Sequence, residues 1–391
     1  MVELAADQGY EKVTVRGLSR LAGVSTGTFY KHFQGVEECF ASTYESLMQR
    51  ALRRAYTAQR ETNGGEEGVR AALQLLLTDF ANHPKEAKVA LFEAYAAGPA
   101  LHPSMIRAAS ALARIIGDDI AGGQPEATTR QRLSQGIAAG VTRVMRARFT
   151  SGQDADLPAL GGELGDWVMA LSSFDVAHRE AFQSRLRARA DREPVFHGSL
   201  PQAAEDERGR ILSAIAKLSL NDGSSTLTVS RICSQAGVSR RAFKAEFADV
   251  EEGFLESIEA IVTAAAARAR QADDRGIDID RMVHALCAEV AQDPPLGHLC
   301  LIDLFEVGRE ALMRRDRWLS LATEQLQIEP PWEGASTVGL EASLAGAWRI
   351  AEAEIAAGRA RALPRLGPLL SRFVLTPMQS ETRPAAELVR A

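Results

Sequence analysis

Several signatures of common protein classes are absent from this sequence of 391 residues. Its four cysteines are widely spaced and form no CxxC pair, which argues against a disulfide framework or a zinc site and favours reduced core thiols. No apolar run reaches the roughly 18 residues that a membrane span needs. The N-terminus also lacks the basic and apolar regions of a signal peptide. We therefore expect a cytoplasmic protein without a membrane partner.

The chain also has no excess of basic residues, with 45 lysines and arginines against 51 aspartates and glutamates. The formal net charge is −6 at pH 7, and the isoelectric point is near 5.8. This balance excludes a uniformly basic coat for nucleic acid, although it is compatible with a small basic patch. The sequence contains no Walker loop, HExxH motif or dinucleotide fingerprint, and its histidines are scattered. We expect no enzyme, no cofactor and no bound metal.

The hydrophobic pattern is almost entirely helical, and no convincing period-two series predicts a strand. The length allows two or three domains, and we expect an all-α fold. The predicted helices of the first half cover residues 2–8, 15–21, 25–31, 36–60, 66–82, 85–97, 103–121, 126–149 and 157–189. Those of the second half cover residues 207–221, 229–235, 239–245, 251–273, 278–292, 295–311, 314–327, 333–358 and 363–375.

One motif occurs twice, 214 positions apart. Residues 14–33 read TVRGLSRLAGVSTGTFYKHF, and residues 228–247 read TVSRICSQAGVSRRAFKAEF. Further matches follow in the same order: 34–40 with 248–254, 81–84 with 291–294, 157–161 with 363–367, and Gly140 and Arg143 with Gly346 and Arg349. Ordered matches across most of each half predict an internal duplication.

The repeated motif is typical of a helix-turn-helix. A threonine hydroxyl can cap its first helix, a serine hydroxyl can cap its second, and glycine supplies a turn with positive φ between them. Two phenylalanines one turn apart would anchor the second helix and leave its other face free to enter a major groove. These roles fall to Thr14, Gly23, Ser25, Phe29 and Phe33 in the first copy, and to Thr228, Gly237, Ser239, Phe243 and Phe247 in the second. Leu18, Leu21 and Ile232 should face the core, and Val24 and Val238 should fill the corner between the helices.

Each copy resembles the N-terminal domain of the TetR family of bacterial transcriptional regulators. In the first copy the resemblance rests on Gly9-Tyr10, Thr14-Val15, Ala22-Gly23-Val24-Ser25 and Phe29-Tyr30-Lys31-His32-Phe33. The family is all-α, with a three-helix DNA-binding head and a larger helical domain that binds a small ligand and dimerises. Its members are mostly repressors that release DNA when the ligand binds. The resemblance therefore implies a DNA-binding regulator whose partners are double-stranded operator DNA and a small-molecule effector.

The resemblance and the repeat together divide the chain. The predicted parts are a helix-turn-helix domain (1–44), a ligand-binding and dimerisation domain (45–190), a linker (191–206), a divergent second helix-turn-helix domain (207–252), a second ligand-binding and dimerisation domain (253–378) and a polar tail (379–391). Met1 aligns with Ile215, so residues 207–214 have no counterpart in the first copy. We expect a mis-assigned start codon as the reason for this short first helix.

The resemblance also assigns roles to residues of the first copy. It places Thr26, Gly27 and Thr28 near base edges, next to the capping Ser25, and it gives phosphate contacts to Thr14, Tyr30, Lys31 and His32. Phosphate contacts set register and affinity, and base contacts set the sequence that is read. The alternative interpretations are that Tyr30 only covers the surface of the head and that Lys31 and His32 are solvated side chains without a role in DNA binding.

The second copy keeps the scaffold of the motif and changes its contact face. Tyr30 is answered by Lys244 and His32 by Glu246, whose carboxylate should repel phosphate. Arg240 and Arg241 could instead read guanines or clamp phosphate. We expect DNA contact through Arg240, Arg241 and Lys244, and the alternative is that this head has drifted into a structural role. A small-molecule sensor or scaffold whose heads no longer bind DNA is the corresponding alternative for the whole protein.

Two other features have competing interpretations. Residues 23–27 match the GxSxG nucleophile elbow of hydrolases, but that motif needs a preceding strand, and a helix is predicted there. The effector pocket has only weak candidates, and an ordinary core role is the preferred interpretation for any one of them: Phe92, Tyr95, Met105, Trp167, Phe305, Trp318 and Trp348.

A duplicated chain can form within itself the four-helix bundle through which family members dimerise. Segments 126–149 and 157–189 would pack on 333–358 and 363–375, with Gly140 and Gly346 permitting close approach. We expect a monomeric pseudo-dimer, with a homodimer of chains as the alternative. Its heads would lie roughly 34–36 Å apart, one turn of DNA, and would read an imperfect palindrome.

Overall fold

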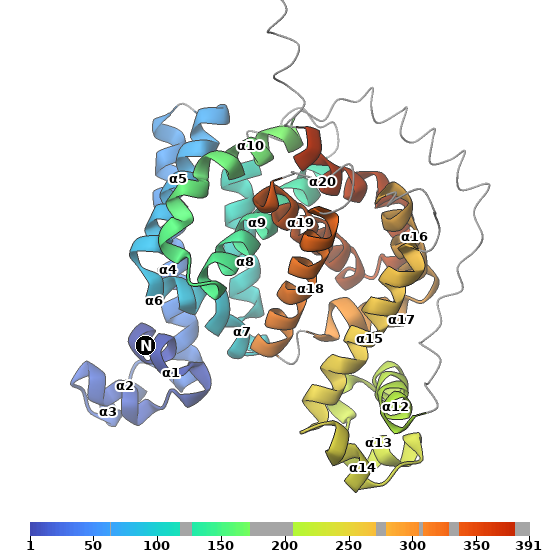
Figure 1. Ribbon diagram of the computed structural model, residues 1–391. Coiled ribbons are helices and arrows are strands. Elements are labelled where there is room, and N and C mark those ends of the chain that lie inside the picture. The colour runs from blue at the N-terminus through green and yellow to red at the C-terminus, as the bar shows by residue number, and fades with distance from the viewer. Residues whose placement is uncertain are drawn as a thin grey trace, which may run out of the picture. The chain divides into compact units, whose positions relative to one another are not determined.

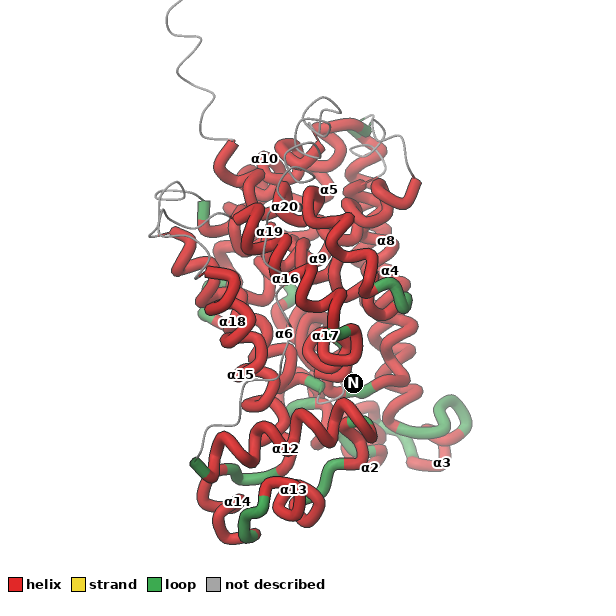
Figure 2. The backbone as a smooth tube through the Cα atoms, turned by 90° about the vertical axis from the view of Figure 1, so that its right-hand side faces the viewer, coloured by secondary structure: helices red, strands yellow, loops and turns green. Residues whose placement is uncertain are grey.

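The computed structural model describes residues 1–62, 64–117, 127–172, 206–270, 279–304, 308–327 and 336–379. Within these ranges every regular element is a helix, and Figure 2 shows no strand. The all-α prediction is therefore confirmed. No helix in the described ranges is long and apolar enough to cross a membrane. The predicted linker up to residue 205, residues 173–189 of one predicted helix, Phe305 and the tail from residue 380 lie outside the described residues.

The chain divides into two compact units that do not follow its order. One unit takes the described residues within 1–174, 315–350 and 373–391, and the other takes those within 175–314 and 351–372. The first unit therefore includes helical segments from the C-terminal part of the chain.

The first unit begins with a three-helix head formed by α1 (Val2–Gln8), α2 (Val15–Ala22) and α3 (Thr26–Tyr30), shown in dark blue in Figure 1. Its body contains α4 (Val36–Glu61), α5 (Gly65–Asn82), α6 (Pro84–Lys88), the π-helical segment Val89–Glu93, α7 (Ala94–Ala96), α8 (His102–Gly117), α9 (Ala127–Thr150) and α10 (Gly161–Ser172). Parts of α18 (Arg309–Gln327), α19 (Thr337–Ala356) and α20 (Gly367–Gln379) complete it. Helix α4 is amphipathic, because Phe40, Tyr44 and Leu47 recur at helical spacing on its buried face.

The second unit has a head of its own, formed by α12 (Glu207–Asp222), α13 (Val229–Ala236) and α14 (Arg240–Glu246). Its body contains α15 (Val250–Arg270), α16 (Ile279–Gln292), α17 (Pro294–Leu301) and the 3-10 segment Ala360–Leu366, together with the remaining parts of α18 to α20. The four cysteines, Cys39, Cys233, Cys287 and Cys300, are free and buried, and burial raises the pKa of both Cys287 and Cys300 to about 12. They are core thiols, as the sequence predicts.

Four predicted helices are wrong in their extent. The helix expected over 295–311 ends at Leu301, and the next begins at Arg309 rather than at residue 314. Gly308 has φ 77°, a left-handed conformation that interrupts a helix. The helices expected from residues 157 and 363 begin instead at Gly161 and Gly367, each after a 3-10 segment that contains a proline. Proline lacks the N–H group that an α-helix interior requires.

Glycines allow close packing in the core of the first unit. A Cβ atom at Gly140 would lie 2.6 Å from the carbonyl oxygen of Ala342 and 2.6 Å from the ring of Trp167. A Cβ atom at Gly346 would lie 2.6 Å from the ring of Phe373. Segments of α9 and α10 therefore pack directly against segments of α19 and α20. The indole N–H of Trp167 donates a hydrogen bond of 2.8 Å to the hydroxyl of Ser343 in the same region.

A buried charge cluster lies beside this packing. Arg146 of α9 donates two hydrogen bonds to Asp316 of α18, at 2.6 and 3.2 Å. Arg315 donates to the same carboxylate at 2.7 Å, and Arg143 donates to the backbone carbonyl of Asp316 at 3.0 Å. Burial alone would raise the pKa of Asp316, but the charges of Arg146 and Arg315 outweigh it and hold that pKa well below the usual range. Glu341 of α19 lies 3.5 Å from the guanidinium of Arg143.

Candidate nucleic-acid interface

The first head has the local geometry of a helix-turn-helix. The hydroxyl of Thr14 accepts a hydrogen bond from the Gly17 N–H at 3.1 Å and caps α2. Helix α2 ends at Gly23, where φ 68° and ψ 26° form a left-handed turn. The hydroxyl of Ser25 then accepts from the Thr28 N–H at 3.0 Å and caps α3. Both caps and the glycine turn that the sequence predicts are present.

Helix α3 shows one face to solvent and buries the other. Phe29 is buried and packs against Phe33, with ring centroids 5.5 Å apart. Tyr30, in contrast, is 60% exposed at the end of the helix. Thr14, Ser25, Thr26, Gly27, Lys31 and His32 are also exposed, and Thr28 is half-buried. The residues assigned to DNA are therefore accessible apart from the half-buried Thr28, whose hydroxyl lies 2.9 Å from that of Ser25.

Two expectations for the first head are wrong. Leu21 is 56% exposed and does not face the core, and Val24 is 42% exposed and does not fill the corner. Leu18 is buried as expected. Gln235, the counterpart of Leu21 in the second head, is exposed as well, so this position lies on the outer face of the short helix in both heads.

The second head has the same two hydroxyl caps and the same left-handed glycine turn as the first. Thr228 caps α13 through the Arg231 N–H at 3.3 Å, and Ser239 caps α14 through the Ala242 N–H at 3.0 Å. Gly237 has φ 64° and ψ 38°. The rings of Phe243 and Phe247 are 5.6 Å apart, and both are fully buried. Ile232 is also buried, as predicted, and Val238 is half-buried.

The contact face of the second head is basic. Arg240, Arg241 and Lys244 are all exposed on α14. Glu246, whose carboxylate was expected to repel phosphate, lies 3.7 Å from the guanidinium of Arg208 on α12. Arg208 also binds Glu256 at 2.6 Å and lies over the ring of Phe247, 4.9 Å from its centroid. The negative charge of Glu246 is thus partly offset.

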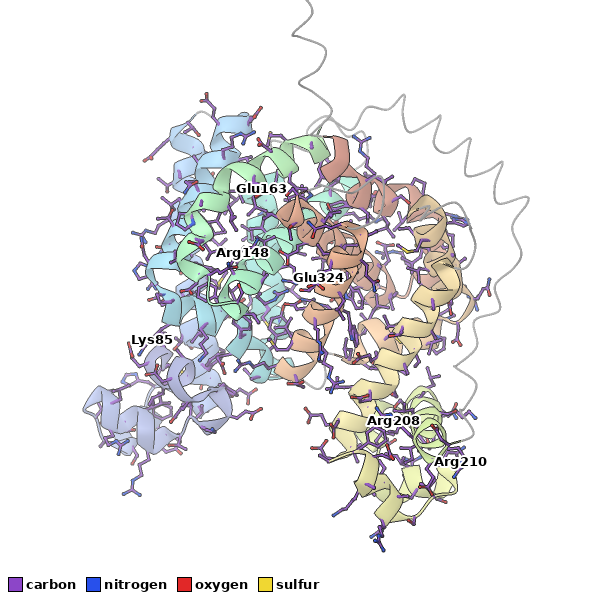
Figure 3. The ribbon with its side chains drawn as sticks, in the orientation of Figure 1. Lys85, Arg148, Glu163, Arg208, Arg210 and Glu324 are labelled. Atoms are coloured by element: carbon purple, nitrogen blue, oxygen red, sulfur yellow. The ribbon has the colours of Figure 1, made fainter. Side chains whose placement is uncertain are left out.

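Arg208 and its helix neighbour Arg210 are cations that the motif comparison missed (Figure 3). Both belong to residues 207–214, which have no counterpart in the first copy, so comparing the copies could not find them. The available signal was the run ERGRIL itself, in which two arginines lie two residues apart at the start of a helix.

The first head is tied to the body of its own unit by charged groups (Figure 3). Lys85 of α6 pairs with both Glu3 and Asp7 of α1, the latter at 3.0 Å. The Tyr10 N–H donates a hydrogen bond of 2.8 Å to the carboxylate of Glu93, a residue that is 1% exposed. The segment from residue 84 to 93 therefore contacts the region around α1 directly.

The serine in the GVSTG run does not occupy a nucleophile elbow. Ser25 follows helix α2, not a strand, and its hydroxyl is engaged by Thr28. The elbow motif requires a strand-to-helix turn that presents the hydroxyl. The run is a helix-turn-helix corner in this structure.

The effector candidates are spread through the molecule. Trp167 lies in the packed core of the first unit beside Phe373, and Phe92 is buried. Tyr95, Met105, Trp318 and Trp348 are half-buried, and Phe305 lies outside the described residues. None of the described candidates lines the large groove of about 1300 Å³ between α4 and α8.

Comparison with known proteins agrees with the geometry of the first head. Residues 2–43 match the model of the tetR family of bacterial regulatory proteins. The first head is TetR-like. No curated protein matches the sequence. Among solved structures, the chain is similar to the fatty acid degradation regulator FadR from Bacillus halodurans, at 20% identity over 43% of this chain and 90% of that chain, with a TM-score of 0.39. That likeness is too weak to carry a ligand or a function over to this protein.

Proposed function

We propose that this protein is a ligand-responsive transcriptional regulator in which two TetR-like repeats are joined in one chain. The family match and the TetR-like first head support DNA binding and transcriptional regulation. The observation that carries the rest is the recurrence of the same capping serine, left-handed glycine and pair of contacting phenylalanines in the second head. Both copies keep the parts that build a helix-turn-helix and differ in the side chains on its outer face.

The exposed residues of the two heads suit different DNA sequences. Thr26, Gly27 and Tyr30 present small polar groups and one phenol, whereas Arg240 and Arg241 present guanidinium groups that can bind guanine in a bidentate manner. An operator read by one chain would then consist of two unlike half-sites. Lys31, His32 and Lys244 add phosphate contacts, whose contribution falls as salt rises.

The packing in the first unit supports a pseudo-dimer within one chain. Helices α9 and α10 come from the first half, and the segments packed on them come from α19 and α20 of the second half. Family members form such a bundle between two chains. Here the covalent link would supply both partners, and one chain would carry both heads of an operator complex.

Effector control would act by a shift in population. A ligand that prefers the conformation with poorly placed heads lowers DNA affinity by that preference and no more. In the first head the links from Lys85 and Glu93 to the region around α1 provide a physical connection to the body.

The test is selection of bound DNA from a random pool, performed with the wild type, with Tyr30→Ala and with Arg240→Ala combined with Arg241→Ala. We expect the double variant to relax the half-site that the second head reads. Tyr30→Ala should instead weaken binding of the first head to any sequence, because a phosphate contact sets affinity and not the sequence that is read. Each lost bidentate contact should weaken binding by about 1–3 kcal/mol. If the double variant leaves the selected sequence unchanged and Tyr30→Ala leaves the affinity for DNA unchanged, the assignment of both recognition helices is wrong.

A further inference from the structure

A groove is lined by α4 and α8, two helices of the first unit that lie side by side in Figure 2. Its volume is about 1300 Å³, which exceeds the roughly 300–1000 Å³ of an ordinary small-molecule site. All of its lining residues belong to residues 42–64 and 104–115. The groove is therefore contained in one compact unit.

The charge of this groove is opposite to that of the chain. Its lining includes four arginines, Arg53, Arg60, Arg107 and Arg114, and one carboxylate, Glu45. Four positive charges and one negative charge leave a net charge of +3, whereas the chain as a whole carries −6. A concave surface with excess charge of one sign concentrates ligands of the other sign.

The single carboxylate is already occupied. Glu45 accepts a hydrogen bond from the Ser104 hydroxyl at 2.6 Å and pairs with Arg107. These hydrogen bonds, first from Ser104 and then from Arg107, lower the pKa of Glu45. Among the described residues, Arg53, Arg60 and Arg114 form no ion pair with a carboxylate. Three guanidinium groups are thus available to a ligand.

One of these guanidinium groups is already held in place. Arg60 donates a hydrogen bond of 3.0 Å to the phenol oxygen of Tyr56, and it lies over the same ring at 5.8 Å from the centroid. Tyr56 itself is 47% exposed in the groove. An arginine that is held on an aromatic ring loses less conformational entropy when it binds an anion.

The floor of the groove is apolar. Leu52, Ala108 and Ile115 line it and are almost fully buried, and Met48 and Ala111 extend the apolar strip. The hydroxyl-bearing Tyr44 closes its inner side and is 4% exposed. The apolar floor and the cationic rim of the groove are together complementary to a molecule that has an apolar body and an anionic group.

We propose that the α4–α8 groove binds an elongated small molecule with an apolar body and a carboxylate, sulfonate or phosphate group. Arg53, Arg60 and Arg114 bind the anionic group, and the strip of Leu52, Ala108 and Ile115 binds the body. The effector role of this ligand rests on the proposed function, but the binding site does not. Helix α4 runs without a break from the head, where Phe40 packs on Tyr10, to Arg60 of the groove.

The experiment uses the full chain without DNA and two fluorescent probes that share one ring system. 8-Anilino-1-naphthalenesulfonate carries a negative charge, and N-phenyl-1-naphthylamine is neutral. Arg53→Gln combined with Arg60→Gln removes two positive charges without breaking an ion pair. Arg317→Gln, on the exposed side of α18, is the matched control. Ala111→Phe fills the apolar floor and should weaken both probes.

We expect the double variant to weaken binding of the sulfonate by about tenfold or more, the loss of one charge-assisted hydrogen bond, and to change binding of the neutral probe less than about twofold. Arg317→Gln should change neither. Equal weakening of both probes by the double variant, or no weakening of the sulfonate, would overturn the assignment. A separate measurement of DNA binding by the same chain distinguishes the groove site from the proposed function. A chain that shows this probe pattern but binds no DNA would contradict the proposed function and support the groove site.

Discussion

At the scale of single residues, hydroxyl caps define both helix-turn-helix corners. Ser25 and Ser239 occupy the same position before α3 and α14, and each accepts one backbone N–H at 3.0 Å. These are local interactions between residues three positions apart, which is why the sequence alone predicts them. The same holds for the left-handed turns at Gly23 and Gly237.

Replacing either cap by alanine should loosen its recognition helix. We expect Ser25→Ala and Ser239→Ala each to cost about 1 kcal/mol of local stability, because one N–H of the first turn loses its acceptor. The measurement is hydrogen exchange of the Thr28 and Ala242 amides, which should quicken by about fivefold for 1 kcal/mol. Asparagine, which also caps, should restore the protection. Unchanged exchange in both alanine variants would show that the caps contribute nothing.

Other residue positions depend on neighbours that lie far away in the sequence. Leu21 and Val24 fit the pattern of core residues, yet both are exposed, because burial depends on which distant segments pack over a side chain. Glu246 looks repulsive in the motif, but its partner Arg208 is supplied by α12. No spacing within the motif encodes either fact.

At the scale of helices, the packing of α9 on α18 depends on one carboxylate. Asp316 is 8% exposed and is bound by Arg146 and Arg315. Removing one partner from a buried ion pair leaves uncompensated charge and costs about 3–5 kcal/mol. We therefore expect Asp316→Asn to lower the free energy of unfolding by this amount, measured by urea denaturation at pH 7. Glu324→Gln, an exposed change on the same helix (Figure 3), should have little effect.

The difference in unfolding free energy between wild type and Asp316→Asn should depend on pH, and this dependence tests whether the charge of Asp316 causes it. Because the folded pKa of Asp316 is depressed, its stabilisation is present above the unfolded carboxylate pKa of about 4 and is lost as pH falls toward the folded pKa. The gap in stability between wild type and Asp316→Asn should therefore narrow in acid. A gap that stays constant down to pH 2 would contradict the role of this charge.

Hydrophobic periodicity in the sequence predicts the ends of some helices and misses the ends of others. Long helices such as α4 and α9 begin and end close to the predicted residues, because their apolar repeats are strong. The region around Gly308 was predicted as helix, since one glycine inside an apolar pattern does not by itself announce a break. The sequence does contain a signal for the groove, namely the spacing of its arginines. Arg53 and Arg60 lie seven residues apart on α4, as do Arg107 and Arg114 on α8, a spacing of two helical turns on one face.

At the scale of the whole molecule, the proposed duplication predicts the oligomeric state. A single chain of 42.2 kDa should sediment as a monomer and should bind one operator with a stoichiometry of one chain per site. Its footprint should be unsymmetrical, because α3 and α14 expose different side chains. The measurements are sedimentation velocity with and without operator DNA, followed by footprinting. An obligate dimer of chains would contradict the pseudo-dimer, and a symmetric footprint would contradict unequal readout.

The charge cluster around Asp316 has a further consequence. In a homodimer with two-fold symmetry, each substitution appears on both faces of the interface. Position 352, the counterpart of Arg146 at the spacing that relates Gly140 to Gly346, is a glutamate. If the chain is the proposed pseudo-dimer, its two halves can carry opposite charges at matching positions, as Arg146 and Glu352 do. Such a pseudo-dimer would not exchange subunits with symmetric relatives in the same cell, because neither half would meet a complementary interface in them.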